Sequence, residues 1–407
     1  MKIVQRVLRF ARSPGLGSME GGRQVEVSVA PMMDVTDTHF RYLCRLLSKR
    51  VTLYTEMVVE NTILNRLDDL DLFLGYHRSE KFDNGNGLVL QLGGNNPEKL
   101  AKCAEIAQEW GYSEINLNCG CPSNKVAGQN FGASLMLQPD LVRNCVRSMQ
   151  RVVDIPVTVK CRLGVDKQEG YEHIQNFVSS IPECDHFIIH ARNCILKGLS
   201  PAKNRTVPPL KYHYVHNLTK DFPDKKFSLN GHVENMSQAK ALLQDNDDLF
   251  GVMLGRAAWH DTTVLAQVDS QIFGDKPDET LTRRSVVKEY MKYVNEVVES
   301  RKQTSKDSFR SDLVLLRPLA GLMKGCNGAS RYRSALYQSE KRVSERNHNL
   351  CEVVENALNT VSDAVLDQSL TLPNASKLGK RSREATSQKL DQTSNDSTTS
   401  RITASIN

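Results

Sequence analysis

The feature that most limits the fold of this sequence is a series of eight short apolar segments separated by stretches with helical character. The apolar segments cover residues 27–32, 53–57, 88–94, 114–120, 156–164, 186–192, 226–231 and 251–256. In one intervening stretch, PEKLAKCAEIAQEWG, the apolar residues recur at a period of 3.6, as in an amphipathic helix. Buried strands that alternate with helices eight times over about 230 residues predict an α/β fold, the (β/α)8 TIM barrel.

The composition and the cysteine spacing exclude several other classes of protein. The chain is 40% hydrophobic and 25% charged, which is typical of a globular protein, and no run of about 18 apolar residues could cross a membrane. Ten cysteines spread over 407 residues argue against a disulfide framework and for a reducing compartment. Because the pair Cys119 and Cys121 lacks C-x-x-C spacing, we expect no metal site.

The two ends of the chain differ from the part between them. Residues 1–26 form a basic leader, either a targeting segment or disordered, and the first 19 residues contain four Lys/Arg and no acid. That bias is typical of a transit peptide, so the compartment stays open between the cytoplasm and a mitochondrion or chloroplast. Residues 366–407 are rich in Ser, Thr and Asn, which predicts a disordered tail.

A helical region with a concentrated positive charge follows the barrel segment 27–275. Residues 280–350 contain amphipathic helical patterns without strand signals, which predicts a small helical domain. Residues 281–346 hold 15 Lys/Arg and 7 Asp/Glu, a net charge of +8, whereas the whole chain carries +6. Such clustering is typical of proteins that bind polyanions, and the alternative is a solvated helical face.

Polar or conformationally special residues follow every predicted strand. In a TIM barrel the chemistry takes place at the carboxyl ends of the strands, so these residues are candidates for the site. In chain order they are Pro31-Met32-Met33, Glu56, Gln91, Asn118 with Cys121, Lys160 with Arg162, His190 with Arg192, Asn230-Gly231, and Gly255-Arg256.

Two groups of these residues indicate a bound cofactor. After the last two strands, Gly231 and Gly255 allow the backbone to approach an anion at a helix start, and Arg256 adds a counter-charge, which predicts a phosphate site. Lys160, His190 and the amide of Gln91 provide groups that a reduced flavin ring needs from its protein. The alternatives are glycines that only permit tight turns and polar side chains that are satisfied at strand ends.

The most specific segment is NLNCGCPSNKVAGQNFGASLM, at residues 116–136. Cys121 precedes a proline in a glycine-rich loop, so we expect it to be exposed at the barrel mouth and free to act as an acid. Cys119 is expected to pack inside.

Together these motifs resemble the tRNA dihydrouridine synthases over about residues 27–270. The resemblance is carried by APMMDVTDTHFR, YTEM, LQLGGNNP, INLNCGCPS, GASLM, VKCRLGVD, HAR, NGH and GVMLGR. Residues 190–212, HARNCILKGLSPAKNRTVPPLKY, are similar to the branch that modifies D-loop uridines 20 and 20a. The resemblance implies an FMN-binding barrel and a C-terminal helical domain that grips tRNA.

The resemblance also implies roles for individual residues. Cys121 is expected to be the proton donor. The expected FMN contacts are Pro31, Met32, Met33, Gln91, Lys160, His190, Asn230, Gly231, His232, Gly255 and Arg256. The expected tRNA contacts are Asn118, Arg162, Lys203, Arg205, Arg331 and Arg333. The chain departs from the family pattern at two positions. His232 stands where a second glycine is usual. Ser330 stands where the family has an arginine, and Arg331 could take over the role of that arginine.

The reaction implied is the reduction of a tRNA uridine. NADPH, or alternatively NADH, reduces FMN, which passes a hydride to uridine C6 while Cys121 protonates C5. Because the base must leave its stack, Asn118 and the loop at 190–212 are expected to hold it. We expect a monomer without membrane contact. The alternatives are an FMN barrel acting on a free pyrimidine, which would not need the basic domain, and a non-catalytic RNA-binding protein.

Overall fold

A computed structural model of the chain describes residues 17–19, 22–81, 87–123, 130–168, 170–303, 312–342 and 350–372. Residues 1–16 of the predicted leader and residues 373–407 of the predicted tail lie outside the described residues, as does part of the glycine-rich loop, at 124–129.

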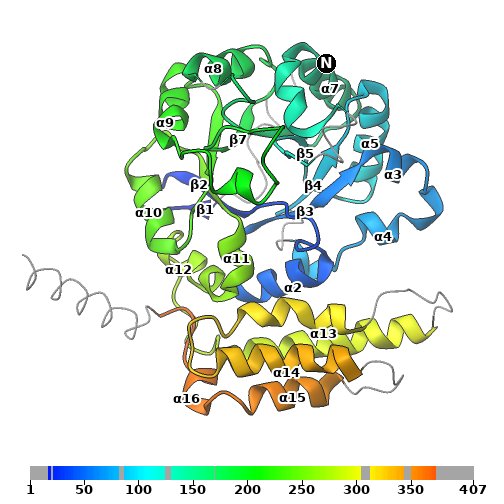
Figure 1. Cartoon of the computed structure of the whole chain (residues 1–407), viewed down its shortest axis with the longest axis vertical. Coiled ribbons are helices and arrows are strands. Elements are labelled where there is room, and N and C mark those ends of the chain that lie inside the picture. The colour runs from blue at the N-terminus through cyan, green and yellow to red at the C-terminus, as the bar shows by residue number, and fades with distance from the viewer. Residues whose placement is uncertain are drawn as a thin grey trace, which may run out of the picture.

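The core of the structure is a closed barrel of parallel strands (Figure 1). Its strands are β2 (Gln24–Val29), β3 (Thr52–Val59), β4 (Leu88–Gly93), β5 (Glu114–Cys119), β6 (Val157–Cys161), β7 (His186–His190), β8 (Lys226–Asn230) and β9 (Gly251–Leu254). They pair in chain order, and β2 also pairs with β9, which closes the barrel. Each of the eight apolar segments overlaps one strand, so the predicted (β/α)8 barrel is confirmed. A short strand, β1 (Gly17–Ser18), pairs antiparallel with β2 within the predicted leader.

Helices surround the barrel strands. They are α2 (Thr38–Leu47), α3 (Glu60–Leu64), α4 (Asp71–Leu74), α5 (Pro97–Glu109), α7 (Pro139–Val152), α8 (Tyr171–Ser179), α9 (Tyr212–Asp221), α10 (Met236–Gln244), α11 (Arg256–His260) and α12 (Val268–Gln271). Local sequence determines where helix α5 begins. The side chain of Asn96 caps the helix by accepting hydrogen bonds from the backbone N–H groups of Glu98 and Lys99, and Pro97 is the first residue of the helix.

A small apolar cluster forms the floor of the site inside the barrel. It consists of Ala30, Tyr54, Val89, Ile188 and Met253 and is separate from the large apolar cluster of the molecule. Alternate strand residues share a face, so Val89 lies on the same side of its strand as Gln91, and Ile188 on the same side as His190. The side chains above this floor therefore project into the barrel mouth.

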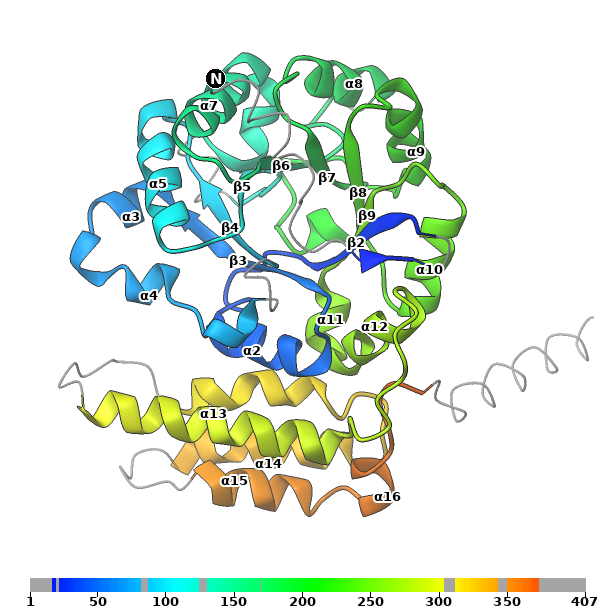
Figure 2. The same cartoon turned by 180° about the vertical axis from the view of Figure 1, so that it is seen from behind.

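The helices from α13 onward form a helical module, defined here as the described residues within 283–372, which stacks against one side of the barrel (Figures 1 and 2). Its elements are α13 (Arg283–Gln303), η6 (Asp312–Gly321), α14 (Ala329–Arg342), α15 (Leu350–Leu358) and α16 (Asp363–Leu366). Helix α13 lies beside α2, where Nδ1 of His39 lies 2.6 Å from the Tyr293 hydroxyl and the Tyr42 and Tyr293 rings stack with centroids 4.0 Å apart.

The start of the predicted disordered tail requires correction. Residues 366–372 are folded at the end of the helical module, because the side chains of Leu366 and Leu370 are buried and Ser369 pairs in a β-bridge with Thr282, the residue before α13. Two apolar residues in a polar segment are enough to anchor it when they meet a complementary surface, which composition alone does not reveal. Among the described residues, no helix is long and apolar enough to cross a membrane.

Candidate active site at the barrel mouth

The barrel brings several of the predicted site residues together at the carboxyl ends of neighbouring strands. The strand register places Asn118 beside Lys160 and His190 beside Asn230. Nζ of Lys160 donates a hydrogen bond to Oδ1 of Asn230 across the mouth, at 3.1 Å. Side chains from β5, β6, β7 and β8 therefore meet in one place, as the strand-end pattern predicts.

The amide groups of Gln91 and Asn118 are joined directly. Nδ2 of Asn118 donates to Oε1 of Gln91 at 2.8 Å, and Oδ1 of Asn118 accepts from the backbone N–H groups of Gly120 and Cys121 at 3.1 and 3.0 Å. Both side chains are buried, with Gln91 1% and Asn118 8% exposed. Asn118 thus holds the start of the loop that carries Cys121.

The two cysteines of the C-x-C pair have different surroundings. Cys119 is fully buried, and burial raises the pKa of its thiol well above the ordinary value. Cys121 is partly exposed, and its carbonyl accepts from the backbone N–H of Ala133 at 3.0 Å. The predicted difference in burial between the two thiols is confirmed, while the role of Cys121 as proton donor stays a prediction.

The polar groups at the mouth carry a concentrated positive charge around a neutral imidazole. Burial and the charge of Arg162 lower the pKa of Lys160 to about 8. Burial and the nearby cations, Arg162 first among them, lower the pKa of His190 well below its ordinary value, which favours the neutral form of its ring. Nδ1 of His190 is buried and has no hydrogen-bond partner among the described residues. The imidazole is therefore available to a ligand.

The segments after β8 and β9 have unusual backbone geometry at the mouth. Gly231 has a φ of +119°, and a Cβ there would lie 3.2 Å from Cδ2 of Leu210. His232 follows with a φ of 57°, in the left-handed region that favours glycine, which accounts for the glycine usual at this position. At Gly255 a Cβ would meet only Ala30, at 4.0 Å, and Arg256 begins α11 with an exposed side chain.

The loop containing Pro31, Met32 and Met33 is held from two sides. The carboxylate of Glu56 accepts a short hydrogen bond from the backbone N–H of Asp34. From the helical module, Arg317 donates to the carbonyl of Asp34 at 2.9 Å. Met33 remains 54% exposed. The helical module thus contacts the loop that carries three of the expected cofactor residues, a link that no local sequence pattern indicates.

The expected tRNA residues occupy three kinds of environment. Arg162 is only 4% exposed, and its guanidinium donates to the carbonyls of Gly120 and Asn204 at 3.2 and 2.8 Å. It therefore ties the Cys121 loop to the segment after β7. Lys203 and Arg205 are exposed in the short turn η4 (Lys203–Arg205). On α14 of the helical module, outside the barrel, Arg331 is exposed and Arg333 half-buried.

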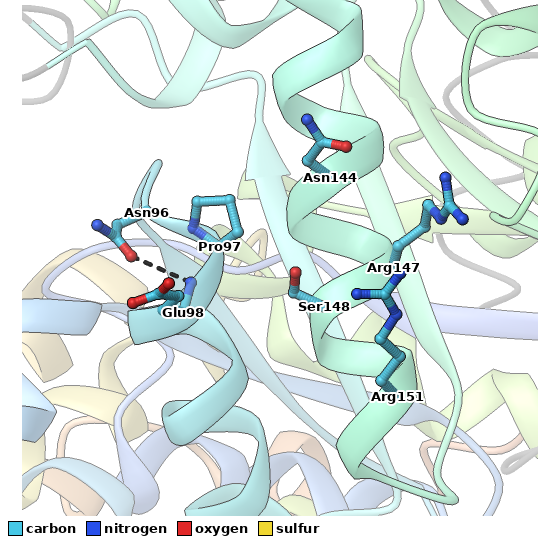
Figure 3. Close-up of a pocket in the computed structure, with 7 residues that line it drawn as sticks. All are labelled: Asn96, Pro97, Glu98, Asn144, Arg147, Ser148 and Arg151. Atoms are coloured by element: carbon cyan, nitrogen blue, oxygen red, sulfur yellow. Dashed lines mark hydrogen bonds between the residues drawn. The ribbon is translucent and has the colours of Figure 1, made fainter.

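A separate pocket of about 560 Å³ lies between the outer helices α5 and α7 (Figure 3). Its lining residues are Asn96, Pro97, Glu98, Asn144, Arg147, Ser148 and Arg151. None of them is a predicted site residue, so this groove is distinct from the barrel mouth. No group of His, Cys, Asp or Glu that could hold a metal ion occurs within the part of the chain that the structure describes.

Comparison with known proteins identifies a family and several similar enzymes. The profile of the family described as "Dihydrouridine synthase (Dus)" matches residues 28–362. The tRNA-dihydrouridine(20/20a) synthase of Vibrio parahaemolyticus is 42% identical over 338 residues, which are 82% of this chain and 95% of that protein. The protein of the same name from Escherichia coli K12 is 41% identical over 339 residues, which are 83% of this chain and 91% of that protein.

The fold and the site define a TIM-barrel enzyme whose polar groups converge at the carboxyl ends of the strands. More specifically, the chain belongs to the dihydrouridine synthase family, since the match runs from within β2 through the rest of the barrel to residue 362 in the helical module. The family resemblance read from the sequence motifs is therefore confirmed.

Proposed function

We propose that this enzyme reduces uridine 20 or 20a in the D-loop of tRNA to dihydrouridine, with FMN as its flavin and NADPH as electron donor. The observation that carries the proposal is the identity of 41–43% to tRNA-dihydrouridine(20/20a) synthases over about four fifths of the chain. Neither alternative function is favoured, because the matching proteins are named as tRNA enzymes.

The residues at the barrel mouth fit a flavin. Nδ1 of His190 is a buried nitrogen without a partner among the described residues, and Gln91 retains hydrogen-bonding capacity beyond its bonds to Asn118 and Asn116. Lys160 supplies a cation at the same barrel mouth, where it bonds Asn230. When bound and reduced, the flavin supplies the hydride that C6 of the uracil receives.

The phosphate of the cofactor fits the segments after β8 and β9. A Cβ at Gly231 would make a tight contact with Leu210, at 3.2 Å, and Gly255 presents open backbone directly before Arg256. Asn230 and His232 flank Gly231, and Pro31 to Met33 lie in the clamped loop after β2. These residues would hold the phosphate, the ribityl chain and one face of the ring.

Cys121 would give the proton of its Sγ to C5 of the uracil, since its thiol is the accessible one of the C-x-C pair. Asn118 and the loop at 190–212 would keep the extruded base in place. Lys203 and Arg205 would contact the neighbouring backbone phosphates, and Arg331 and Arg333 those that reach the helical module, which carries most of the +8 segment 281–346. Arg162 would act on the RNA through the loops that it ties together. We propose that the enzyme works as a monomer.

The test is to map dihydrouridine in tRNA from cells that lack the protein. The expected result is loss of dihydrouridine at positions 20 and 20a, with the other D-loop positions unchanged, and its return when the purified protein is supplied with FMN and NADPH. Unchanged dihydrouridine at both positions would exclude the proposed substrate. An unmodified tRNA transcript with a purine at positions 20 and 20a is the matched control.

A further inference from the structure

A continuous row of hydrogen bonds connects the Cys121 loop with the opposite end of the barrel. Below the bond from Asn118 to Gln91, Nε2 of Gln91 donates to Oδ1 of Asn116 at 2.8 Å. Nδ2 of Asn116 donates to the hydroxyl of Thr158 at 3.0 Å, and that hydroxyl donates to Oε1 of Glu114 at 2.6 Å. We call Asn118, Gln91, Asn116, Thr158 and Glu114 the polar ladder.

The direction of every bond in the polar ladder is determined by its upper end. The backbone N–H groups of Gly120 and Cys121 can only donate, so the atom of Asn118 that faces them is its oxygen. Its NH2 group must then face the oxygen of Gln91, and the NH2 group of Gln91 must face the oxygen of Asn116. Each amide therefore has one orientation, with no ambiguity between oxygen and nitrogen.

The lower end of the polar ladder requires an acceptor. Because Asn116 donates to the Thr158 hydroxyl, that hydroxyl must direct its own hydrogen elsewhere. Glu114 accepts it at 2.6 Å, whereas the carbonyl of Ile115 lies farther away at 3.4 Å. Thr158 is 3% exposed and Asn116 is fully buried, so water cannot replace either partner without opening the barrel.

We infer that Asn116 and Thr158 are positioning residues, which fix the amide of Gln91 toward the flavin and, through Asn118, the backbone of Cys121. Neither residue touches the mouth itself, because Asn116 lies two positions before Asn118 and Thr158 two before Lys160, one layer deeper in the barrel. The inference rests on the proposed function for the flavin, while its effect on Cys121 depends only on the protein.

The test uses variants that differ by single atoms. Thr158→Val keeps the shape of the side chain but removes the acceptor for Asn116, and Thr158→Ser keeps the hydroxyl. Thr52→Val is the matched control, because Thr52 is equally buried, 2% against 3% exposed, and lies outside the polar ladder beside Glu26. Glu114→Gln retains an oxygen that can accept from Thr158 and tests whether the charge of Glu114 matters.

Two measurements are made on each variant. The first is the rate at which iodoacetamide alkylates Cys121 in flavin-free protein. The alkylation rate of Cys121→Ala is subtracted, because Cys326 and Cys351 are also partly exposed and contribute to the total. The second is the dissociation constant of FMN. We expect Thr158→Val to change both by about fivefold or more, which corresponds to about 1 kcal/mol for an unpaired buried donor. Thr158→Ser, Glu114→Gln and Thr52→Val should stay within about twofold of the wild type.

The inference is overturned if Thr158→Val matches Thr52→Val in both measurements. Should Thr158→Val fail to fold, Asn116→Leu provides the test one step higher, because a leucine of similar size can neither accept from Gln91 nor donate to Thr158. An altered alkylation rate together with no FMN binding by the wild type would contradict the proposed cofactor and leave the ladder supported. Failure of the two proposals is thus distinguishable.

Discussion

At the scale of single residues, the site depends on environment more than on residue type. Cys119 and Cys121 are separated by one glycine, yet burial raises the thiol pKa of Cys119, whereas Cys121 is partly exposed. His190 and Lys160 are weakened as bases by burial and by the neighbouring cations, chiefly Arg162. These environments determine which group can move a proton or hold a charge at the mouth.

Cys121→Ala should abolish most product formation while leaving the flavin in place. General acid catalysis is typically worth roughly 10²–10⁴-fold in rate, and a decrease of that size in dihydrouridine formation is expected. Bound FMN and its reduction by NADPH should be close to normal. Cys119→Ala is the control, and we expect it to retain most activity; a loss as large as that of Cys121→Ala would disprove the assignment of the acid.

The affinity for FMN should depend on pH through Lys160. Because the pKa of Lys160 is lowered to about 8, the cation predominates below that pH and is lost above it. If FMN binding needs this cation, the affinity for FMN decreases as the pH rises from about 7 to 9. Titration calorimetry across this range measures the effect. Lys160→Arg should flatten the profile because arginine stays protonated, and an equal decline in both proteins would rule Lys160 out as the cause.

At the scale of elements, the ends of the strands and the first residues of the loops carry the site. The strands fix where each side chain projects, and the loops fix what can approach. The left-handed or open backbone at Gly231, His232 and Gly255 lies directly after β8 and β9. Backbone geometry, rather than side-chain chemistry, therefore shapes the proposed phosphate site.

Gly231→Ala should reduce both stability and FMN affinity. The φ of +119° is unfavourable for alanine, and the added Cβ would lie 3.2 Å from Leu210. Gly274→Ala is the matched control, because Gly274 also has a positive φ, +71°, with no atom within 4 Å of the added Cβ. We expect Gly274→Ala to cost about 1 kcal/mol in stability and to bind FMN normally. Normal FMN binding by Gly231→Ala would show that this backbone does not contact the cofactor.

At the scale of the whole molecule, the barrel and the helical module share an interface that includes the loop of the site. The bond from Arg317 to the Asp34 carbonyl and the contact of Tyr293 with His39 and Tyr42 join them. Deleting the module would expose His39 and Tyr42 on the barrel and remove the bond from Arg317 to the loop at Asp34. Point variants are therefore the appropriate way to test its part in RNA binding.

Arg333→Ala should weaken tRNA binding to a similar extent for different tRNAs. A lost phosphate contact reduces the slope of log K against log salt by about one. The matched control is Arg284→Ala, since Arg284 lies in the same module but its charge is already paired with Asp363 and Asp367. Equal salt slopes for wild type and Arg333→Ala would place Arg333 outside the RNA interface.

The acids at the lower end of the barrel should limit stability at alkaline pH. Burial, followed by the charge of Glu114, raises the pKa of Glu26, although Lys226 opposes the shift and His186 lies 4.0 Å away. Because the folded-state pKa is raised, the stability associated with protonated Glu26 is complete below its unfolded pKa of about 4. It is lost as the pH rises through the raised value.

Glu26→Gln should therefore lose less thermal stability than the wild type between about pH 6 and pH 9. Each kcal/mol retained corresponds to about 2–4 °C in Tm for a protein larger than 150 residues. The control is Glu98→Gln, an exposed acid on α5, whose curve should follow that of the wild type. Parallel melting curves for Glu26→Gln and the wild type would contradict the expected role of this carboxyl group.

The sequence by itself determined the barrel, the position of the candidate residues at its mouth, and the family. Strand segments, helix periods and motifs such as INLNCGCPS are local patterns, and a closed parallel barrel brings the ends of all its strands to one side. Gln91, Lys160 and His190 could be identified in this way because each ends or nearly ends a buried strand.

Only the tertiary structure decided which of these residues support one another. Asn116 and Thr158 follow the same alternation as Asn118 and Lys160, so they could be placed inside the barrel, but their hydrogen bonds depend on the register of β4, β5 and β6. Arg317 meets Asp34 across 283 residues of chain, and Leu370 anchors a segment that reads as disordered. Local periodicity carries no information about such contacts, because they form only when separately specified surfaces pack together.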